Sequence, residues 1–527
     1  MHVSLTPLRC LFRAVDLYPS KVGVVSGDSR FTYAEFSKRC RRLAAGLVRE
    51  GAQPGDRIGL LSFNSNVLLE SYFAVPMIGC VVMPLNVRLH QSELEVILKH
   101  SQPRIVFYEQ DFKPAIEYLR AAVPAIRFIS IEDSGGGSTL SELMDTDPLA
   151  LPDLMTVDET SIAELFYTSG STGQPKGVTL SHRALYLHAL SLFSCLDHSD
   201  TQVVLHTIPL FHANGWGFPQ FATMCGLKQV MVRRFDPSTV FRLIEEEGAT
   251  VMILVPTMAA ALLACDVRTK FNLSSLKQVI IGGAAATAEL IAQLEGIFPA
   301  THVIAGYGST ETAPVVSTAR PKSTILLDHD KDRQRFAASA GWPLVGVEVR
   351  VVDSDGRDVP QDGSTVGEIA VRGDNVMDGY YREPQLTADA IVDGWFHTGD
   401  MASWDQERCL KVADRKKDII ISGGENIASI EIEHAIQAHP DVLECAVVAA
   451  PDPRWGEIPV AIVVTRQDAA VTEEALLEWT GKHVARFKLP KRFILRTEPL
   501  PKGGTGKVLK YELREQFWAG KQKRVQG

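Results

Sequence analysis

The sequence predicts an α/β protein with a large N-terminal domain of sheets flanked by helices, a β-rich subdomain, and a small α+β C-terminal domain. Helical patterns alternate with short β-branched runs over roughly the first 280 residues, as expected for helices packed on sheets. Closely spaced strand patterns separated by Asp-Gly turn signals follow between residues 346 and 371. A compact tail that alternates helix and strand patterns then follows the charged pentapeptide 414–418.

The first domain is expected to contain several strands among its helices. A chain of 527 residues exceeds the roughly 100 to 200 residues of a usual domain, so more than one core is expected. The uncharged stretch 71–87 is interrupted by Pro76, Gly79 and Pro84, and falls short of the roughly 20 apolar residues of a spanning helix. We therefore expect a buried helix that leads into a strand, and no transmembrane segment. The predicted strands cover residues 57–62, 104–108, 163–167, 178–180, 251–255 and 277–282.

The later part of the chain predicts two further regions. Strands at 347–352 and 368–371 form the β-rich subdomain, between turn signals at Asp355-Gly356 and Asp362-Gly363. The tail predicts helices near 429–438 and 472–484 and strands at 445–449 and 460–464. The predicted domains are residues 1–416 and 417–527, with the charged pentapeptide as the hinge.

Composition excludes several classes of protein. With 45% hydrophobic and 22% charged residues the chain is an ordinary globular protein and not a disordered one. A net charge of -9 argues against a nucleic-acid partner, which usually needs a strongly basic face. The eight scattered cysteines form no metal-ligand pattern, and the N-terminus carries no secretion signal, so we expect a cytoplasmic protein with reduced core cysteines.

The segment 167–177 is the most specific signal for chemistry. Glycines let backbone N–H groups approach phosphate oxygens, hydroxyls donate further hydrogen bonds, and a lysine adds a point charge. The segment lacks the Gly-Lys-Ser/Thr triplet of a Walker loop. A solvated linker is the alternative, but the flanking strand patterns disfavour it. The small and charged residues of this segment are Thr168, Ser169, Gly170, Ser171, Thr172, Gly173 and Lys176.

Three other segments are weaker when taken singly. Residues 306–311 combine an aromatic ring, hydroxyls and the carboxylate of Glu311, which is suited to Mg²⁺. Residues 395–400 end in Asp400, whose carboxylate can accept hydrogen bonds from ribose hydroxyls. Residues 501–507 place Lys507 at the end of a glycine loop. Each segment alone could be an ordinary turn.

In this order, the four segments resemble the acyl-adenylate-forming superfamily, which includes acyl-CoA synthetases, carrier-protein-linked adenylation domains and firefly luciferase. The resemblance covers nearly the whole chain, and residues 209–216 are most similar to the fatty acyl-CoA synthetase branch. It implies that ATP and Mg²⁺ activate a monocarboxylic acid as acyl-AMP with release of pyrophosphate. Thioesterification with CoA would follow.

The resemblance also implies residue roles. Thr168 and Glu311 would hold Mg²⁺, Thr310 would contact the α-phosphate, and Lys507 would be the adenylation lysine. Catalysis is thus expected from Lys507, Glu311, His212 and Thr310, and acid binding from His212, Ala213, Trp216 and Gly306. The implied nucleotide site comprises Thr168, Ser169, Gly170, Ser171, Thr172, Gly173, Lys176, Gly283, Ala284, Ala305, Gly306, Tyr307, Gly308, Ser309, Thr310, Asp400, Arg415 and Lys417.

Rotation of the small domain is a further implication of the resemblance. A carboxylate is a poor nucleophile, so positioning and positive charge must carry adenylation, and the lysine is no longer needed afterwards. The small domain would swing near Lys417, remove Lys507, and bring residues 423–426 toward a pantetheine tunnel.

The acid and the acceptor stay open at the level of sequence. Ile421 and Asn426 depart from the long-chain branch, and the alanines 284–286 leave room beside the adenylate. A fatty acid, an aryl acid and methylmercaptopropionate all fit, and we expect an apolar tail because a charged tail needs a buried partner. Transfer to a carrier protein or another nucleophile is the enzymatic alternative, and a catalytically inactive nucleotide-binding module is the non-enzymatic one. A homodimer is expected only because some relatives form one.

Overall fold

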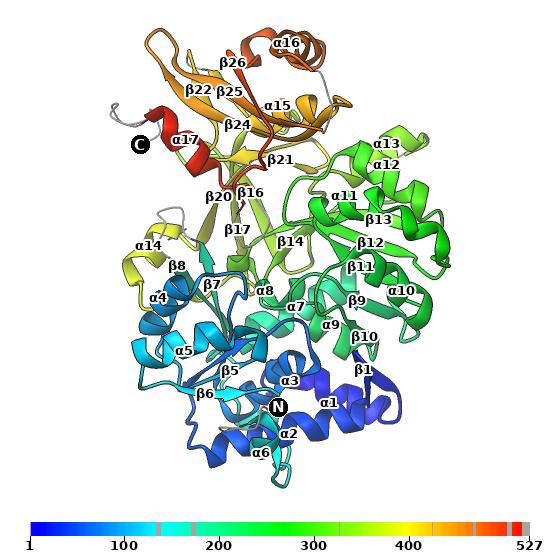
Figure 1. The fold of residues 1–527 in the computed structure, drawn as a ribbon, viewed down its shortest axis with the longest axis vertical. Coiled ribbons are helices and arrows are strands. Elements are labelled where there is room, and N and C mark those ends of the chain that lie inside the picture. Colours follow the sequence, from blue (N-terminus) through cyan, green and yellow to red (C-terminus); the bar gives the residue numbers. More distant parts are fainter. Residues whose placement is uncertain are drawn as a thin grey trace. The chain divides into compact units, whose positions relative to one another are not determined.

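The computed structural model describes residues 2–132, 139–169, 175–325, 327–423, 425–466, 471–502 and 508–518 (Figure 1). The chain divides into two compact units. The first unit is residues 1–348 with 371–396, and the second is 349–370 with 397–527. The predicted boundary after residue 416 concerns a proposed hinge, and it stays a prediction.

A seven-stranded sheet forms one part of the first unit, with the order β18-β8-β7-β4-β3-β5-β6. The strands from β7 to β6 are parallel, and β8 and β18 add an antiparallel edge. Such a sheet is buried on both faces by helices, which explains the nearly continuous apolar runs of its strands. The bounds are β3 (Arg57–Leu61), β4 (Val81–Pro84), β5 (Ile105–Tyr108), β6 (Arg127–Ser130), β7 (Ile162–Ser169), β8 (Pro175–Ser181) and β18 (Gly379–Tyr380).

A nine-stranded sheet forms the other part, with the order β15-β14-β13-β12-β11-β9-β10-β1-β2. Its strands from β13 to β1 are parallel, so their carboxyl ends share one edge, where ligands of α/β proteins usually bind. The bounds are β1 (Val22–Ser26), β2 (Ser29–Thr32), β9 (Val203–His206), β10 (Lys228–Met231), β11 (Val251–Leu254), β12 (Gln278–Gly282), β13 (His302–Gly308), β14 (Val315–Thr318) and β15 (Trp342–Pro343).

Helices connect and cover these strands (Figure 1). Local sequence sets where several of them begin: Thr32 and Glu35 form a capping box at α2, and Ser65 accepts from the Leu68 N–H at the start of α3. The bounds are α1 (Leu8–Leu17), α2 (Tyr33–Arg49), α3 (Asn66–Ala74), α4 (Gln91–Ser101), α5 (Lys113–Ala122), α6 (Leu140–Met144), α7 (His182–Cys195), α8 (Ala213–Trp216), α9 (Phe218–Met224), α10 (Pro237–Glu247), α11 (Pro256–Ala264), α12 (Ala288–Ile297), α13 (Asp330–Ala337) and α14 (Pro384–Ala390).

Two smaller sheets carry most of the second unit. One has the order β16-β17-β20-β19, with β21 paired to β20, and the other β23-β22-β25-β24, with β26 paired to β25. The bounds are β16 (Val347–Val352), β17 (Gly367–Gly373), β19 (Ile391–Val392), β20 (Trp395–Trp404), β21 (Leu410–Arg415), β22 (Ile420–Ser422), β23 (Glu425–Ile427), α15 (Ser429–Gln437), β24 (Val442–Asp452), β25 (Gly456–Thr465), α16 (Glu473–Gly481), β26 (Arg492–Arg496) and α17 (Lys510–Trp518).

The predicted fold class is confirmed: helix-flanked sheets, a β-rich region and a small α+β C-terminal region are all present. The stretch 71–87 contains the end of α3 and then β4, as expected for a buried helix that leads into a strand. Helix α16 ends at Gly481, three residues before the predicted end. Six of the eight cysteines are buried, in agreement with core positions. None of the helices within the described ranges is long and apolar enough to cross a membrane.

Candidate functional site

The hairpin of β7 and β8 carries the predicted phosphate-binding segment. Thr168 on β7 lies directly opposite Lys176 on β8, and Ser169 lies opposite Pro175. Both Thr168 and Lys176 are half-buried near the turn of this hairpin. The predicted residues Gly170, Ser171, Thr172 and Gly173 lie outside the described residues, as does Lys507.

Glu311 lies close to this hairpin although it is far away in the sequence. It belongs to a single 3₁₀ turn, Thr310–Thr312, and its backbone carbonyl accepts from the Met377 N–H at 2.8 Å. Its carboxylate Oε1 accepts from the Tyr380 hydroxyl at 3.2 Å, and Lys176 Nζ lies 5.3 Å from the centre of the Tyr380 ring. The structure therefore brings Lys176 and Glu311 together through Tyr380.

Sequence reasoning missed Tyr380. It lies on β18, which pairs with β8 so that Tyr380 is opposite Val178. Burial, and then the nearby Glu311 carboxylate, raise the pKa of Tyr380, so its hydroxyl stays protonated and donates. The only sequence signal was the aromatic pair Tyr380-Tyr381 after a glycine, and this pattern does not point to a partner 69 residues earlier.

A glycine-lined surface marks the carboxyl ends of β12 and β13. Gly282 lies opposite Gly306, while Gly283 and Ala284 are exposed just beyond β12. A Cβ on Gly308 would lie 1.8 Å from the Pro314 carbonyl oxygen, so this position accepts no side chain. The predicted adenine-slot residues thus lie beside the 306–311 segment.

Trp216 covers the same edge from helix α8. A Cβ on Gly282 would lie 2.9 Å from the Trp216 indole, and a Cβ on Gly283 would lie 3.4 Å from it. The same Cβ on Gly283 would lie 3.3 Å from a methyl group of Val255. Trp216, with a φ of 63°, is held in the left-handed region, which is unusual for a bulky residue. An indole, a valine and glycines therefore form an apolar wall beside the predicted adenine slot.

His212 directly precedes α8, Ala213 is the first residue of this helix, and both are half-buried. The ring of His212 lies 4.6 Å from the ring of Phe211, measured between centroids. The His212 N–H donates to the Pro209 carbonyl at 3.0 Å, and the His212 carbonyl accepts from the Gly215 N–H at 3.0 Å. These residues form a tight turn between β9 and Trp216.

His188 on α7 is a second residue that the sequence did not reveal. It contacts both the segment after the Glu311 turn and the segment after Trp216. Its Nε2 accepts from the Val315 N–H at 3.1 Å, just after the Glu311 turn. A Cβ on Gly217 would lie 2.4 Å from its Nδ1, so the chain after Trp216 passes directly over the ring. Burial lowers the pKa of His188 to about 3, which keeps the ring neutral. A histidine within a largely apolar helix carries no signal of this role.

In the second unit, Asp400 and Arg415 face each other across β20 and β21. They are directly opposite in register, and Arg415 Nε lies 2.8 Å from Asp400 Oδ1. Asp400 is buried while Arg415 is exposed. The predicted ribose-binding pair is therefore an ion pair. Lys417 follows two residues later, and its carbonyl accepts from Arg514 Nη1 at 3.3 Å.

A buried network close to Lys417 was not foreseen. Lys510 Nζ donates to Ser429 Oγ at 2.6 Å and pairs with Glu433 Oε1 at 2.8 Å. Ser429 in turn donates to Asp414 Oδ2 through its N–H at 2.6 Å and its hydroxyl at 2.5 Å. Burial by itself would lower the pKa of Lys510, but Glu433 and Asp414 outweigh burial and raise it. The lysine is therefore a buried cation that links α17, α15 and β21.

The chemistry of two oxygen donors in the first unit, Glu311 and Thr168, would suit a magnesium ion. No group of three or more His, Cys, Asp or Glu side chains suited to a metal occurs in the part of the chain that the structure describes. Mg²⁺ commonly takes only one or two protein carboxylates and completes its shell with phosphates and water. The half-buried Glu311 carboxylate, with the Thr168 hydroxyl as a second oxygen, is such a donor set.

Family models, curated proteins and solved structures all relate this chain to AMP-binding enzymes. The family model "AMP-binding enzyme" matches residues 11–381, and "AMP-binding enzyme C-terminal domain" matches residues 431–507. The long-chain-fatty-acid–CoA ligase of Thermus thermophilus is 38% identical, over 93% of this chain and 90% of that protein. The 3-methylmercaptopropionyl-CoA ligase of Ruegeria lacuscaerulensis is 34% identical, over 93% and 92%. The crystal structure of ATP-bound MatB from Rhodopseudomonas palustris is 30% identical, with a TM-score of 0.86 over 98% of this chain and 99% of that one.

Proposed function

The chain belongs to the AMP-binding enzyme family and is an AMP-forming acid–CoA ligase, and from this premise we propose that its substrate is a monocarboxylic acid with an apolar tail. The observation that carries the proposal is the wall formed by Trp216, Val255 and the glycines 282 and 283. Indole, methyl groups and backbone provide no charge to compensate a charged tail, which would be costly to desolvate there.

Relatives support an apolar tail but not its length. The names of the two enzymes compared above cover a long-chain fatty acid and a short thioether acid. Both acids combine one carboxylate with an uncharged tail. We propose that His212 meets the carboxylate end of the acid and that the indole of Trp216 bounds its tail, with Ala213 and Gly306 lining the space between.

We assign the nucleotide to the edge where β7, β12 and β13 end and β8 begins. Tyr307 stacks on adenine beside Gly283 and Ala284, and the hydroxyl of Thr310 contacts the α-phosphate. Lys176 supplies charge to the phosphates, while a ribose-binding role of Asp400 and Arg415 follows from the resemblance to the family alone. Thr168 and Glu311 would hold Mg²⁺, which would offset the charge of the phosphate oxygens.

The proposed chemistry proceeds in two steps. An oxygen of the substrate carboxylate attacks the α-phosphorus of ATP, and the bond to pyrophosphate breaks, which gives acyl-AMP. The CoA thiol then loses its proton, and its sulfur attacks the acyl carbon, so that AMP leaves. Lys507 contributes positive charge to the first step only, and Tyr380 orients the Glu311 carboxylate through its hydrogen bond.

Pyrophosphate release tests the substrate class. ATP and Mg²⁺ are supplied with short, medium and long fatty acids, thioether acids, aryl acids and a dicarboxylic acid, each with and without CoA. We expect release only with apolar-tailed monocarboxylic acids, and turnover that depends on CoA. Preference for the dicarboxylic acid would contradict the apolar wall, release without CoA dependence would indicate another acceptor, and no release at all would favour an inactive nucleotide-binding module.

A second experiment tests Lys507. Lys507→Ala should abolish acyl-AMP formation and spare thioester formation from supplied acyl-AMP. Lys502→Ala is the matched control, because Lys502 lies in the same segment but pairs with Glu444. Equal loss of both half-reactions in Lys507→Ala would contradict a role confined to the first step.

A further inference from the structure

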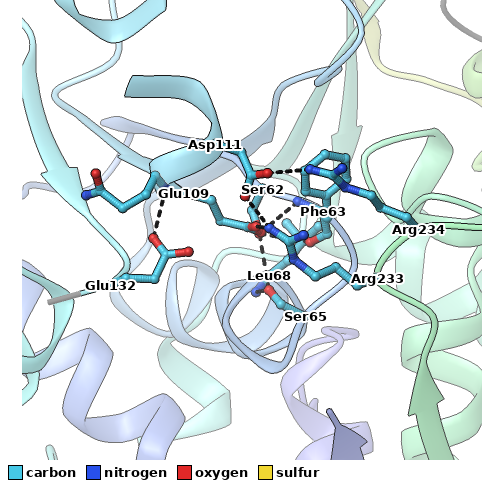
Figure 2. Close-up of polar contacts among 10 residues, drawn as sticks. Ser62, Phe63, Ser65, Leu68, Glu109, Asp111, Glu132, Arg233 and Arg234 are labelled. Carbon is cyan, nitrogen blue, oxygen red and sulfur yellow. Dashed lines mark hydrogen bonds and ion pairs between the residues drawn. The ribbon is translucent and has the colours of Figure 1, made fainter. Parts of the chain in front are cut away.

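A polar cluster outside the residues discussed so far lies where β3, β5 and β10 end (Figure 2). Its centre is the carboxylate of Glu109, a residue that is only 4% exposed. Glu109 Oε1 accepts from Ser62 Oγ at 2.6 Å and from the Phe63 N–H at 2.8 Å, and Oε2 accepts from Arg233 Nη2 at 2.5 Å. The buried carboxylate therefore fastens the loop after β3, in one sheet, to the end of β10, in the other.

Two adjacent arginines reach this cluster but differ in their contacts. Both pair with Asp111, and both lie over the Phe63 ring, at 4.7 Å for Arg233 and 4.3 Å for Arg234. Only Arg233 is paired with Glu109 (Figure 2). Substitution of either arginine therefore removes a positive charge that lies over the Phe63 ring. Substitution of Arg233 also removes the pair with Glu109, whereas substitution of Arg234 leaves that pair in place.

The loop held by Glu109 presents Asn64 to the segment that precedes His212. The buried Asn64 amide donates to the carbonyls of His206 and Ile208, both at 3.0 Å. Its Oδ1 accepts from the Leu210 N–H at 2.7 Å. All three hydrogen bonds of this one side chain go to the backbone of residues 206–210.

Tyr72 on α3 completes the support of the same segment. Its buried hydroxyl donates to the Leu210 carbonyl at 2.7 Å, so Asn64 and Tyr72 together satisfy both backbone groups of Leu210. Leu210 is itself fully buried, and only Phe211 separates it from His212. Four hydrogen bonds of the backbone of this segment are thus made with Asn64 and Tyr72.

We propose that Asn64 is a positioning residue for the acid site, which places His212 and Trp216 through residues 206–210 and is itself held by the Glu109–Arg233 pair. The inference rests on the proposed function, because it takes His212 and Trp216 as the acid-binding residues. Misplacement of reacting groups by about 1 Å can cost on the order of 100-fold in rate. Loss of the Asn64 hydrogen bonds should therefore damage acid use far more than nucleotide use.

The test compares the kinetics of the full-length enzyme for each substrate. In Asn64→Ala we expect kcat/KM for the acid to fall about 10-fold to 100-fold, with the KM for ATP within about 2-fold of wild type. Tyr72→Phe should give a smaller change in the same direction. Thermal unfolding is measured in parallel, because a purely structural role would lower stability and all kinetic constants together.

If Asn64→Ala does not fold, substitutions of Arg233 and Arg234 test whether the Glu109–Arg233 pair holds Asn64 in place. Arg233→Gln should raise the KM for the acid, whereas the matched Arg234→Gln should not. Equal effects of the two arginine substitutions, or a uniform loss toward acid and ATP, would overturn the positioning role. Wild-type enzyme that releases no pyrophosphate with any acid would instead overturn the proposed function, and the positioning role with it.

Discussion

In each unit a buried glutamate pairs with a cation whose exposure differs between the two units. Glu109 in the first unit pairs with Arg233, whose side chain is 47% exposed, whereas Glu433 in the second unit pairs with Lys510, whose side chain is 16% exposed. Half of the Arg233 side chain stays in water, and the buried Glu109 carboxylate also accepts from the Ser62 hydroxyl and the Phe63 N–H. A buried pair is costly to form and much more costly to break, because the remaining charge has no solvent. The two pairs therefore differ in their dependence on water: the Arg233 guanidinium stays half hydrated, whereas the Lys510 ammonium depends on its protein partners.

Breaking the buried pair should have the largest effect. Lys510→Met leaves the Glu433 carboxylate buried without its cation, so we expect a loss of about 3–5 kcal/mol in the free energy of unfolding. Urea denaturation followed by tryptophan fluorescence measures it. Lys482→Met is the matched control, because its partner Glu478 is 75% exposed, and we expect a change of at most about 1 kcal/mol. Equal shifts in both variants would remove the contrast between buried and exposed pairs.

Three buried histidines of the first unit should make its stability depend on pH, because their pKa values differ between the folded and the unfolded chain. Burial lowers the pKa of His188 to about 3, and those of His182 and His206 to about 4. In the unfolded chain these rings take up a proton near pH 6.5, while in the folded protein they stay neutral. Stability should therefore be complete above pH 6.5 and fall as the pH drops toward 4, with a slope of about 1.4 kcal/mol per pH unit for each ring.

Acid unfolding of His188→Gln checks this assignment. Glutamine can still accept from the Val315 N–H but does not take up a proton. Between pH 6.5 and pH 4, the free energy of unfolding should thus fall less steeply than in wild type. The difference should equal the contribution of one histidine ring, about 1.4 kcal/mol per pH unit. An unchanged slope would show that His188 does not contribute to acid sensitivity.

The smallest effect on stability is expected at the apolar wall. Gly282→Ala places a methyl group 2.5 Å from the Gly306 carbonyl oxygen and 2.9 Å from the Trp216 indole, and a backbone oxygen cannot easily move. We expect a cost of about 1–3 kcal/mol and a raised KM for the acid. The control is Gly296→Ala in α12, where a Cβ meets nothing within 4 Å and should stabilise the helix by about 0.5–1 kcal/mol. Acid kinetics and thermal unfolding of both variants decide the matter, and an unaltered KM in Gly282→Ala would place the acid elsewhere.

Local sequence patterns predicted individual strands and helices. They did not predict which distant residues come into contact, because those contacts depend on the order of the strands in the sheets. Strand β16, for example, has the limits that the sequence predicts. The alternation of side chains between the two faces of a strand can be recognised from adjacent residues. The contact of Tyr380 with Glu311 depends on β18 joining β8, and the contacts of Asn64 depend on two different sheets meeting. Such pairings join residues 69 and 142 positions apart, a distance at which periodicity carries no information. The roles of the motif residues themselves, Lys507 above all, remain predictions that the kinetic experiments address.

The network around Lys510 sets a condition for exchanging parts between related enzymes. Asp414 lies before the predicted boundary at residue 416, while Ser429, Glu433 and Lys510 lie after it, and all four side chains share one chain of hydrogen bonds. A chimera cut at 416 would combine one parent's aspartate with the other parent's helix. A cut before β21 would transfer the whole network intact, so recombinants should tolerate the earlier junction better, even though it transplants more foreign sequence.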